Sequence, residues 1–295
     1  MRCGVCSSDI VPDSAERLFE KIRGWGFECV QLSFTSVKEC NYTEDGRFEI
    51  PWAVPDAVCD MIAGTSERYG VPIEAVNGTF NMAHPDPDVR AEGLARFGGF
   101  AKAAVRVGAK MITLCSGTRE PSYLWAYSDE NDTEQAWRDM ETTMRRAVEI
   151  AEKLGVTLAI ETEASNVISS PEKARKIMDG IGSDKLKMIL DMANLFPKGT
   201  AKKENVRPTL KRAVDVFGKD VVIMHGKDIK EGDGIDFCGT GDGIVDFPYA
   251  ASLMKSAGYK GDMFLHGIFD ESRFASAREY WNRCWDGAGE NGAET

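Results

Sequence analysis

The sequence predicts an α/β fold, a (β/α)8 TIM barrel that forms a single domain over residues 1–295. Two observations predict it: eight short apolar runs of strand character, and an amphipathic helical pattern after each run. Eight strand-then-helix units favour parallel strands with right-handed crossovers, which close naturally into a barrel. An open doubly wound sheet is the alternative, but the first run continues into SSDIVPDS, without a glycine-rich phosphate turn.

The expected strands are rich in Val, Ile and Leu. They lie at 2–7, 28–34, 72–78, 110–117, 156–161, 186–191, 220–228 and 262–267. The expected helices lie at 14–25, 55–69, 87–107, 133–154, from 171 onward, 205–218, 246–257 and 270–286. Ser170 and Pro171 carry a helix-start signal, with Pro at the first helical position. The longest connections, 116–132, 192–204 and 228–244, follow strand ends, where a barrel builds its active site.

The composition is typical of a globular protein that binds neither nucleic acid nor membranes. The 295 residues are 43% hydrophobic and 28% charged, as in soluble globular proteins, and the net charge is −11. This acidic balance disfavours nucleic acid and anionic membranes as partners, and no apolar run reaches membrane-span length. Eight dispersed cysteines without a signal peptide predict reduced thiols in the cytoplasm. Cys3 and Cys6 are expected to be buried strand residues, since a second pair or thioredoxin-like context is missing.

Four polar residues follow the last four expected strands. Glu161 and Asp191 end the fifth and sixth runs, while His225 and His266 lie at the ends of the seventh and eighth. Positions two apart in a strand share a face, so each tops a column of apolar interior residues, namely Ala159, Ile189, Ile223 and Phe264. Two carboxylates and two imidazoles suit Mn²⁺, Fe²⁺, Zn²⁺ or Co²⁺. The sequence therefore predicts a divalent metal at the barrel mouth.

Further polar and aromatic residues fall near these strand ends. The candidates for binding substrate or orienting the ligands are His84, Trp125, Glu163, Asn194, Lys227 and Asp228. Trp125, in the long fourth connection, is the expected wall against which a sugar stacks. Glu163 and Asp228 either hydrogen-bond the ligands or cap the next helix. The glycine-rich stretch 239–253 is either a phosphate cradle or a loop shaped for close passage; its spacing favours the loop.

Several stretches together resemble the xylose isomerase-like barrels, often described as sugar phosphate isomerases and epimerases. They are NMAHPDPDVR, LAIETEASNVISSPEKA, LKMILDMANLF, VIMHGKDI, GTGDGIVDF and GYKGDMFLHG, spread over residues 75–267. The resemblance implies that Glu, Asp, His and a second Glu from the last four strands hold a divalent metal, often Mn²⁺. Carried over by position, these become Glu161, Asp191, His225 and His266, so the last ligand is His instead of Glu. Asn194 also stands where many epimerases have His.

The resemblance implies a divalent-metal-dependent isomerase or epimerase that acts on a keto-sugar or sugar derivative through a metal-bound enediolate. Mn²⁺ is the expected cofactor, with Zn²⁺, Fe²⁺, Co²⁺ or Mg²⁺ as alternatives, and the expected partners are a small carbohydrate and a second copy of the chain. Glu161 and His266 are the expected proton-moving groups. Because the second Glu is replaced, the alternative is a metal-dependent lyase or dehydratase, for example one that cleaves 3-keto-glycosides. An apurinic endonuclease and a non-catalytic sugar-binding barrel are lesser alternatives.

Overall fold

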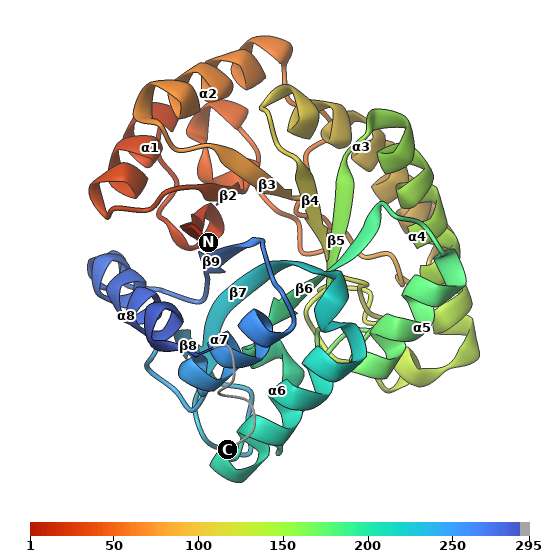
Figure 1. Ribbon diagram of the computed structural model, residues 1–295. Helices are drawn as coiled ribbons and strands as arrows, with labels where there is room; N and C mark the ends of the chain where they lie inside the picture. Colours follow the sequence, from red (N-terminus) through yellow and green to blue (C-terminus); the bar gives the residue numbers. More distant parts are fainter. Residues whose placement is uncertain (290–295) are drawn as a thin grey trace.

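A computed structural model describes residues 1–289, and these form a closed barrel of parallel strands inside a ring of helices (Figure 1). The barrel strands are β1 (Cys3–Cys6), β2 (Val30–Leu32), β3 (Ile73–Asn77), β4 (Met111–Leu114), β5 (Thr157–Glu161), β6 (Leu186–Asp191), β7 (Val221–Ile229) and β9 (Asp262–Leu265). Each pairs with its neighbours in the order β1 to β7 and then β9; β6 pairs with β7, and β9 returns to β1. The predicted fold class is confirmed.

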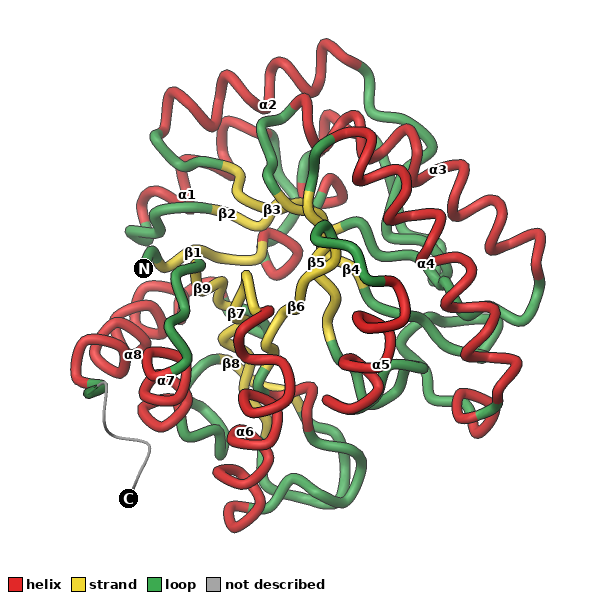
Figure 2. Tube along the Cα trace, turned by 45° about the vertical axis from the view of Figure 1, so that its right-hand side comes forward, coloured by secondary structure: helices red, strands yellow, loops and turns green. Residues whose placement is uncertain are grey.

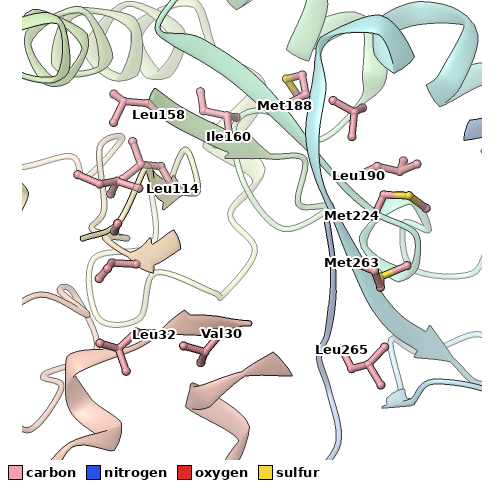
Figure 3. Packing of buried hydrophobic residues seen from close by; sticks show 14 of the residues in the cluster. Val30, Leu32, Leu114, Leu158, Ile160, Met188, Leu190, Met224, Met263 and Leu265 are labelled. Atoms are coloured by element: carbon pink, nitrogen blue, oxygen red, sulfur yellow. The ribbon is translucent and has the colours of Figure 1, made fainter. Parts of the chain in front are cut away.

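Alternation along the strands produces two apolar layers. Leu158 and Ile160 of β5, like Met188 and Leu190 of β6, pack outward against the helices (Figure 3). The residues between them point into the barrel, where a separate cluster consists of Cys6, Cys29, Ala75, Ala159, Ile189, Ile223 and Phe264. The four columns expected beneath the strand-end polar residues are therefore present.

The helices surround the strands on all sides (Figure 2). They are α1 (Ala15–Gly24), α2 (Asp56–Tyr69), α3 (Pro87–Arg106), α4 (Glu134–Leu154), α5 (Pro171–Ile181), α6 (Lys203–Phe217), α7 (Phe247–Ser256) and α8 (Phe274–Gly287). Ser170 caps α5 by accepting from the amide of Lys173, with Pro171 in the first turn, as predicted. Gly155 and Gly182 end α4 and α5 with positive φ. Within residues 1–289, no helix is long and apolar enough to cross a membrane.

One strand was not predicted. β7 continues past the barrel rim, and β8 (Phe237–Gly239) folds back on it, pairing antiparallel with Lys227–Ile229. The stretch that forms β8 has no apolar alternation long enough to indicate a strand, so only its pairing with β7 reveals it.

The two CxxC thiols face different layers, since Cys3 packs outward and Cys6 points into the barrel. All eight cysteines are free and buried.

Candidate metal and active site

The carboxyl ends of the barrel strands open into a cavity of about 600 Å³, a volume typical of small-molecule sites. Its floor is polar because the last inward position of several strands carries a polar side chain, including Gln31, Asn77 and Thr113. Aromatic residues at the wall and rim are Tyr123, Trp125, Phe237 and Phe269. The cavity lies where a barrel of this type places its active site.

Glu161 and His225 line this floor, and Asp191 lies next to them, fully buried. One ligand atom from each lies within 4.8 Å of the others, and all three residues are buried. His225 Nδ1 is 3.6 Å from Glu161 Oε2 and 3.6 Å from Asp191 Oδ2. The strand register explains the meeting, because Asp191 is the direct neighbour of His225 in the β6–β7 pair.

Two ligand atoms of this group have no hydrogen-bond partner in the described part of the chain and could bind a cation. Within residues 1–289, Asp191 Oδ2 and His225 Nδ1 are buried without a hydrogen-bond partner. Lys227 Nζ lies 3.3 Å from Asp191 Oδ2, and two carboxylates lie 3.6 Å from His225 Nδ1, but these are ion-pair distances without hydrogen bonds. A divalent ion with mixed nitrogen and oxygen ligands would satisfy both atoms. Backbone amides of Ala193 and Asn194 donate to the other oxygen, Asp191 Oδ1, at 2.9 and 3.1 Å and fix the carboxylate plane. Burial opposes ionisation of Asp191, but the charge of Lys227 and the nearby imidazole outweigh it and lower its pKa.

The second nitrogen of His225 is also anchored. Nε2 is 2.9 Å from Gln31 Oε1 and 3.9 Å from Cys6 Sγ. A ring nitrogen that donates to an amide oxygen directs the lone pair of the other nitrogen toward the ligand position. Gln31 on β2 thus orients His225 from across the barrel.

His266 lies beside the group but outside it. Its ring is 5.5 Å from that of His225, centre to centre, in an edge-to-face arrangement, and its Nδ1 lies 3.0 Å from Asp9 Oδ1. Asp9, which follows β1, also accepts from the amide of Ile268 at 3.2 Å. The structure therefore places three of the four predicted ligands together, with the fourth held by a carboxylate.

Three of the predicted auxiliary residues line the cavity around Glu161. Asn194 donates from Nδ2 to Glu161 Oε1, and Lys227 Nζ lies 3.3 Å from Asp191 Oδ2. Glu163 is buried, and Ser165 donates to it through its backbone and hydroxyl. Burial raises the pKa of Glu163 to about 7, against the opposing charge of Lys227.

Asp228 faces away from the cavity and organises the glycine-rich loop. Its buried carboxylate accepts from the amides of Ile229, Gly241, Gly243 and Val245 at 2.8 to 3.1 Å. A Cβ on Gly243 would lie 2.3 Å from the carbonyl oxygen of Ile229, so the close passage requires glycine. The amides of the loop thus bind a carboxylate of the chain itself. This agrees with the prediction that the stretch 239–253 is a loop shaped for close passage.

His84 and Trp125 have different surroundings. His84 is buried in the loop before α3, with Nε2 3.1 Å from the Pro121 carbonyl oxygen and Nδ1 accepting from the Asp86 amide. It does not line the cavity and instead joins two loops. Trp125 does line the cavity wall, and its Nε1 donates to Glu49 Oε1 at 2.8 Å.

Sequence reasoning missed Asp9, Gln31 and Glu49. The signal for Gln31 was present, since a polar residue at an inward strand position near the carboxyl end predicts a floor residue. Asp9 ends the short 3-10 helix Ser7–Asp9, and Glu49 lies in an irregular segment. In neither does periodicity indicate which way the side chain points.

Comparisons with known proteins agree with this architecture. The model of the family described as xylose isomerase-like TIM barrel matches residues 19–284. L-ribulose-5-phosphate 3-epimerase UlaE of Escherichia coli (strain K12 / DH10B) is 26% identical over 265 residues, covering 88% of this chain and 84% of the relative.

Solved structures share the fold. D-psicose 3-epimerase from Clostridium cellulolyticum H10, solved with D-tagatose, superposes with a TM-score of 0.70 at 14% identity, covering 97% of this chain and 99% of that one. The IOLI protein with a bound zinc atom superposes with a TM-score of 0.74 at 16% identity, over 98% and 99% of the two chains.

Proposed function

The chain belongs to the xylose isomerase-like TIM barrel family, and on this premise we propose that it is a divalent-metal-dependent isomerase or epimerase of a keto-sugar or sugar derivative. The observation that carries the proposal is the buried Glu161–Asp191–His225 group at the floor of a polar cavity. The sugar epimerases among its relatives support the reaction class. Eight free, buried thiols suit a reducing compartment such as the cytoplasm.

Glu161, Asp191 and His225 would hold the cation, for which Mn²⁺ is our favoured assignment. A bound divalent ion supplies Lewis acidity that polarises a carbonyl and acidifies the hydrogen on the neighbouring carbon. Gln31 and the amides after Asp191 hold the ligands in place, so the site is preorganised before substrate arrives.

Proton transfer falls to Glu161 and His266. The carboxylate of Glu161 removes a proton from the carbon next to the carbonyl. Asn194 orients this carboxylate by donating a hydrogen bond to Oε1. His266 lies beside His225, and Asp9 engages its Nδ1, which leaves Nε2 to exchange a proton with substrate. Epimerisation then requires a carboxylate on one side of the carbon and an imidazole on the other.

This asymmetry supports a second candidate, a metal-dependent lyase acting on 3-keto-glycosides. Glu161 would remove the proton, and His266 would protonate the departing oxygen instead of the carbon. Release of an aglycone from a 3-keto-glycoside, without formation of an epimer, would favour this reaction over epimerisation.

Replacement of Glu161 by Gln tests the proposal. We expect wild-type protein loaded with Mn²⁺ to incorporate solvent deuterium next to the carbonyl of a turned-over ketose such as L-ribulose or D-tagatose, measured by proton NMR. Glu161→Gln should lower the exchange rate at least about 100-fold, since general base catalysis is worth about that much. Glu149→Gln, an exposed residue of α4, is the matched control. Full exchange activity in Glu161→Gln would contradict the role of Glu161.

A further inference from the structure

The side of the cavity opposite the Glu161–Asp191–His225 group is acidic. Glu44 and Glu49 lie in the segment between β2 and α2 and line the cavity across the barrel from β6 and β7. Asn77 Nδ2 donates to Glu49 Oε2 at 2.7 Å, and Trp125 Nε1 donates to Oε1 at 2.8 Å. Both donors are neutral, so they orient the carboxylate without compensating its charge.

Positive charge is scarce in the same cavity. Among the described residues that line it, Lys227 is the only lysine or arginine. Its Nζ lies 3.3 Å from Asp191 Oδ2 and 4.2 Å from the centre of the Phe237 ring. Lys227 therefore acts as the counter-ion of the carboxylate cluster and has little charge to offer an anion.

The loop after β8, at one of the usual phosphate positions of a barrel, has its amides occupied. Barrel enzymes often bind phosphate on backbone amides of the loops after the last two strands. In this chain the amides of Gly241, Gly243 and Val245 donate to the buried carboxylate of Asp228. A phosphate at this loop would have to displace that carboxylate and leave it buried without partners.

We propose that the cavity accepts uncharged sugars or sugar derivatives and discriminates against those that carry a phosphate or carboxylate. The inference rests on the proposed function and names the substrate class of the same site. Hydroxyl groups of a neutral sugar donate to Glu44 and Glu49, and the rings of Trp125 and Tyr123 pack on its C–H face. An anionic group at the same end of the substrate would meet like charge at short range.

Matched pairs of free sugar and terminal phosphate test the inference. The pairs are L-ribulose with L-ribulose 5-phosphate and D-tagatose with D-tagatose 6-phosphate, measured on Mn²⁺-loaded protein. We expect kcat/KM to be at least about tenfold higher for the free sugar. Because the effect is electrostatic, the ratio should fall as NaCl is raised, whereas a purely steric exclusion would not respond to salt.

The Glu49→Gln variant locates the discrimination. At pH 8, above the pKa of Glu49, replacing its carboxylate by an amide of the same shape removes one negative charge and should bring the free-to-phosphate ratio several-fold closer to one. Glu149→Gln, on an exposed face of α4, should leave the ratio unchanged. Calorimetric titration of each sugar and each phosphate into Mn²⁺-loaded His266→Gln, which keeps Glu161, Asp191 and His225, measures the same preference without epimerisation. The free sugar is expected to bind more tightly.

The outcomes separate the two proposals. A phosphate that is turned over or bound as well as its free sugar, with a ratio insensitive to salt and to Glu49→Gln, overturns the substrate class and leaves the isomerase or epimerase proposal standing. Preferred binding of free sugars without any proton exchange supports the substrate class and contradicts the proposed reaction instead.

Discussion

The orientation of His266 depends on one carboxylate, that of Asp9. Its two oxygens lie 3.0 and 3.1 Å from Nδ1 of the imidazole, and one of them also accepts from the Ile268 amide. A histidine held in this way presents its other nitrogen in a defined direction and tautomer. Asp9 also lines the cavity, and we expect it to act mainly by positioning His266.

The Asp9→Asn variant should lower kcat about tenfold to a hundredfold with a smaller change in KM, because the amide keeps the shape but loses the charge that orients the imidazole. Steady-state kinetics and metal analysis check this. Asp215→Asn, an exposed residue of α6, is the control. An unchanged kcat in Asp9→Asn, with normal metal content, would show that His266 needs no orienting partner.

Glu49 makes the stability of the protein depend on pH. Burial, reinforced by the charge of Glu44, raises its pKa from about 4.5 to about 7. Between these values the folded protein holds a proton that the unfolded chain has released, so stability falls as the pH rises through this window. The Glu49→Gln variant has no carboxyl group at this position and therefore lacks this pH dependence. We therefore compare the free energy of unfolding of Glu49→Gln with that of the wild type. Because the Glu49 side chain is only partly buried, we expect this difference to shift in favour of the variant by roughly 1–2 kcal/mol from pH 5 to pH 8.

Urea denaturation of both proteins at the two pH values measures this difference. The comparison between pH values cancels the hydrogen bonds that Gln makes or loses, since these do not titrate. Parallel pH profiles for wild type and Glu49→Gln would show that Glu49 ionises normally in the folded state.

The β7–β8 hairpin is the element that connects the floor of the site to its rim. β7 contributes His225 and Lys227 to the floor, then continues to Asp228, whose carboxylate holds the loop that follows β8. One face of β7 therefore contributes side chains to the cavity, and the other face holds the loop through Asp228. Because successive residues alternate, Lys227 and Asp228 have opposite roles despite their adjacency.

Asp228→Ala should lower the free energy of unfolding by about 2–4 kcal/mol, since four backbone amides lose their acceptor. Chemical denaturation followed by circular dichroism measures the loss. Asp215→Ala, on the exposed face of α6, should change stability by less than about 0.5 kcal/mol. A cost below about 1 kcal/mol for Asp228→Ala would mean that water replaces the carboxylate easily.

At the scale of the whole molecule, the candidate metal site depends on the folded barrel. Glu161 comes from β5, Asp191 from β6 and His225 from β7, so the ligand group exists only when the barrel is closed. A cation that binds the folded state alone stabilises it by about 2.7 kcal/mol at a hundredfold excess over Kd. Metal binding therefore has a readout that is independent of any substrate.

Removal of divalent ions with EDTA should lower the Tm by several degrees, and Mn²⁺ or Zn²⁺ should restore it. Differential scanning fluorimetry measures both steps. Asp191→Asn should lose the metal-dependent shift, whereas Asp215→Asn should keep it, because its side chain is exposed on α6. A Tm that responds to none of Mn²⁺, Zn²⁺ or Co²⁺ would contradict the metal site.

The sequence by itself determined the barrel and which strand-end residues face its interior. Strand alternation assigns Ala159 and Glu161 to the inside and Leu158 to the outside, and a closed parallel barrel brings all carboxyl ends to one rim. That the ends of β5, β6 and β7 meet was therefore predictable from local pattern and strand count alone.

Only the tertiary structure decided which partners these residues have. Asp9 and His266 are 257 positions apart, and Glu49 and Trp125 are 76 apart, in segments without periodicity. Local pattern carries no information on such contacts, because they depend on how irregular loops pack over the rim. The acidic side of the cavity, on which the proposed substrate class rests, emerges only when these loops are placed together.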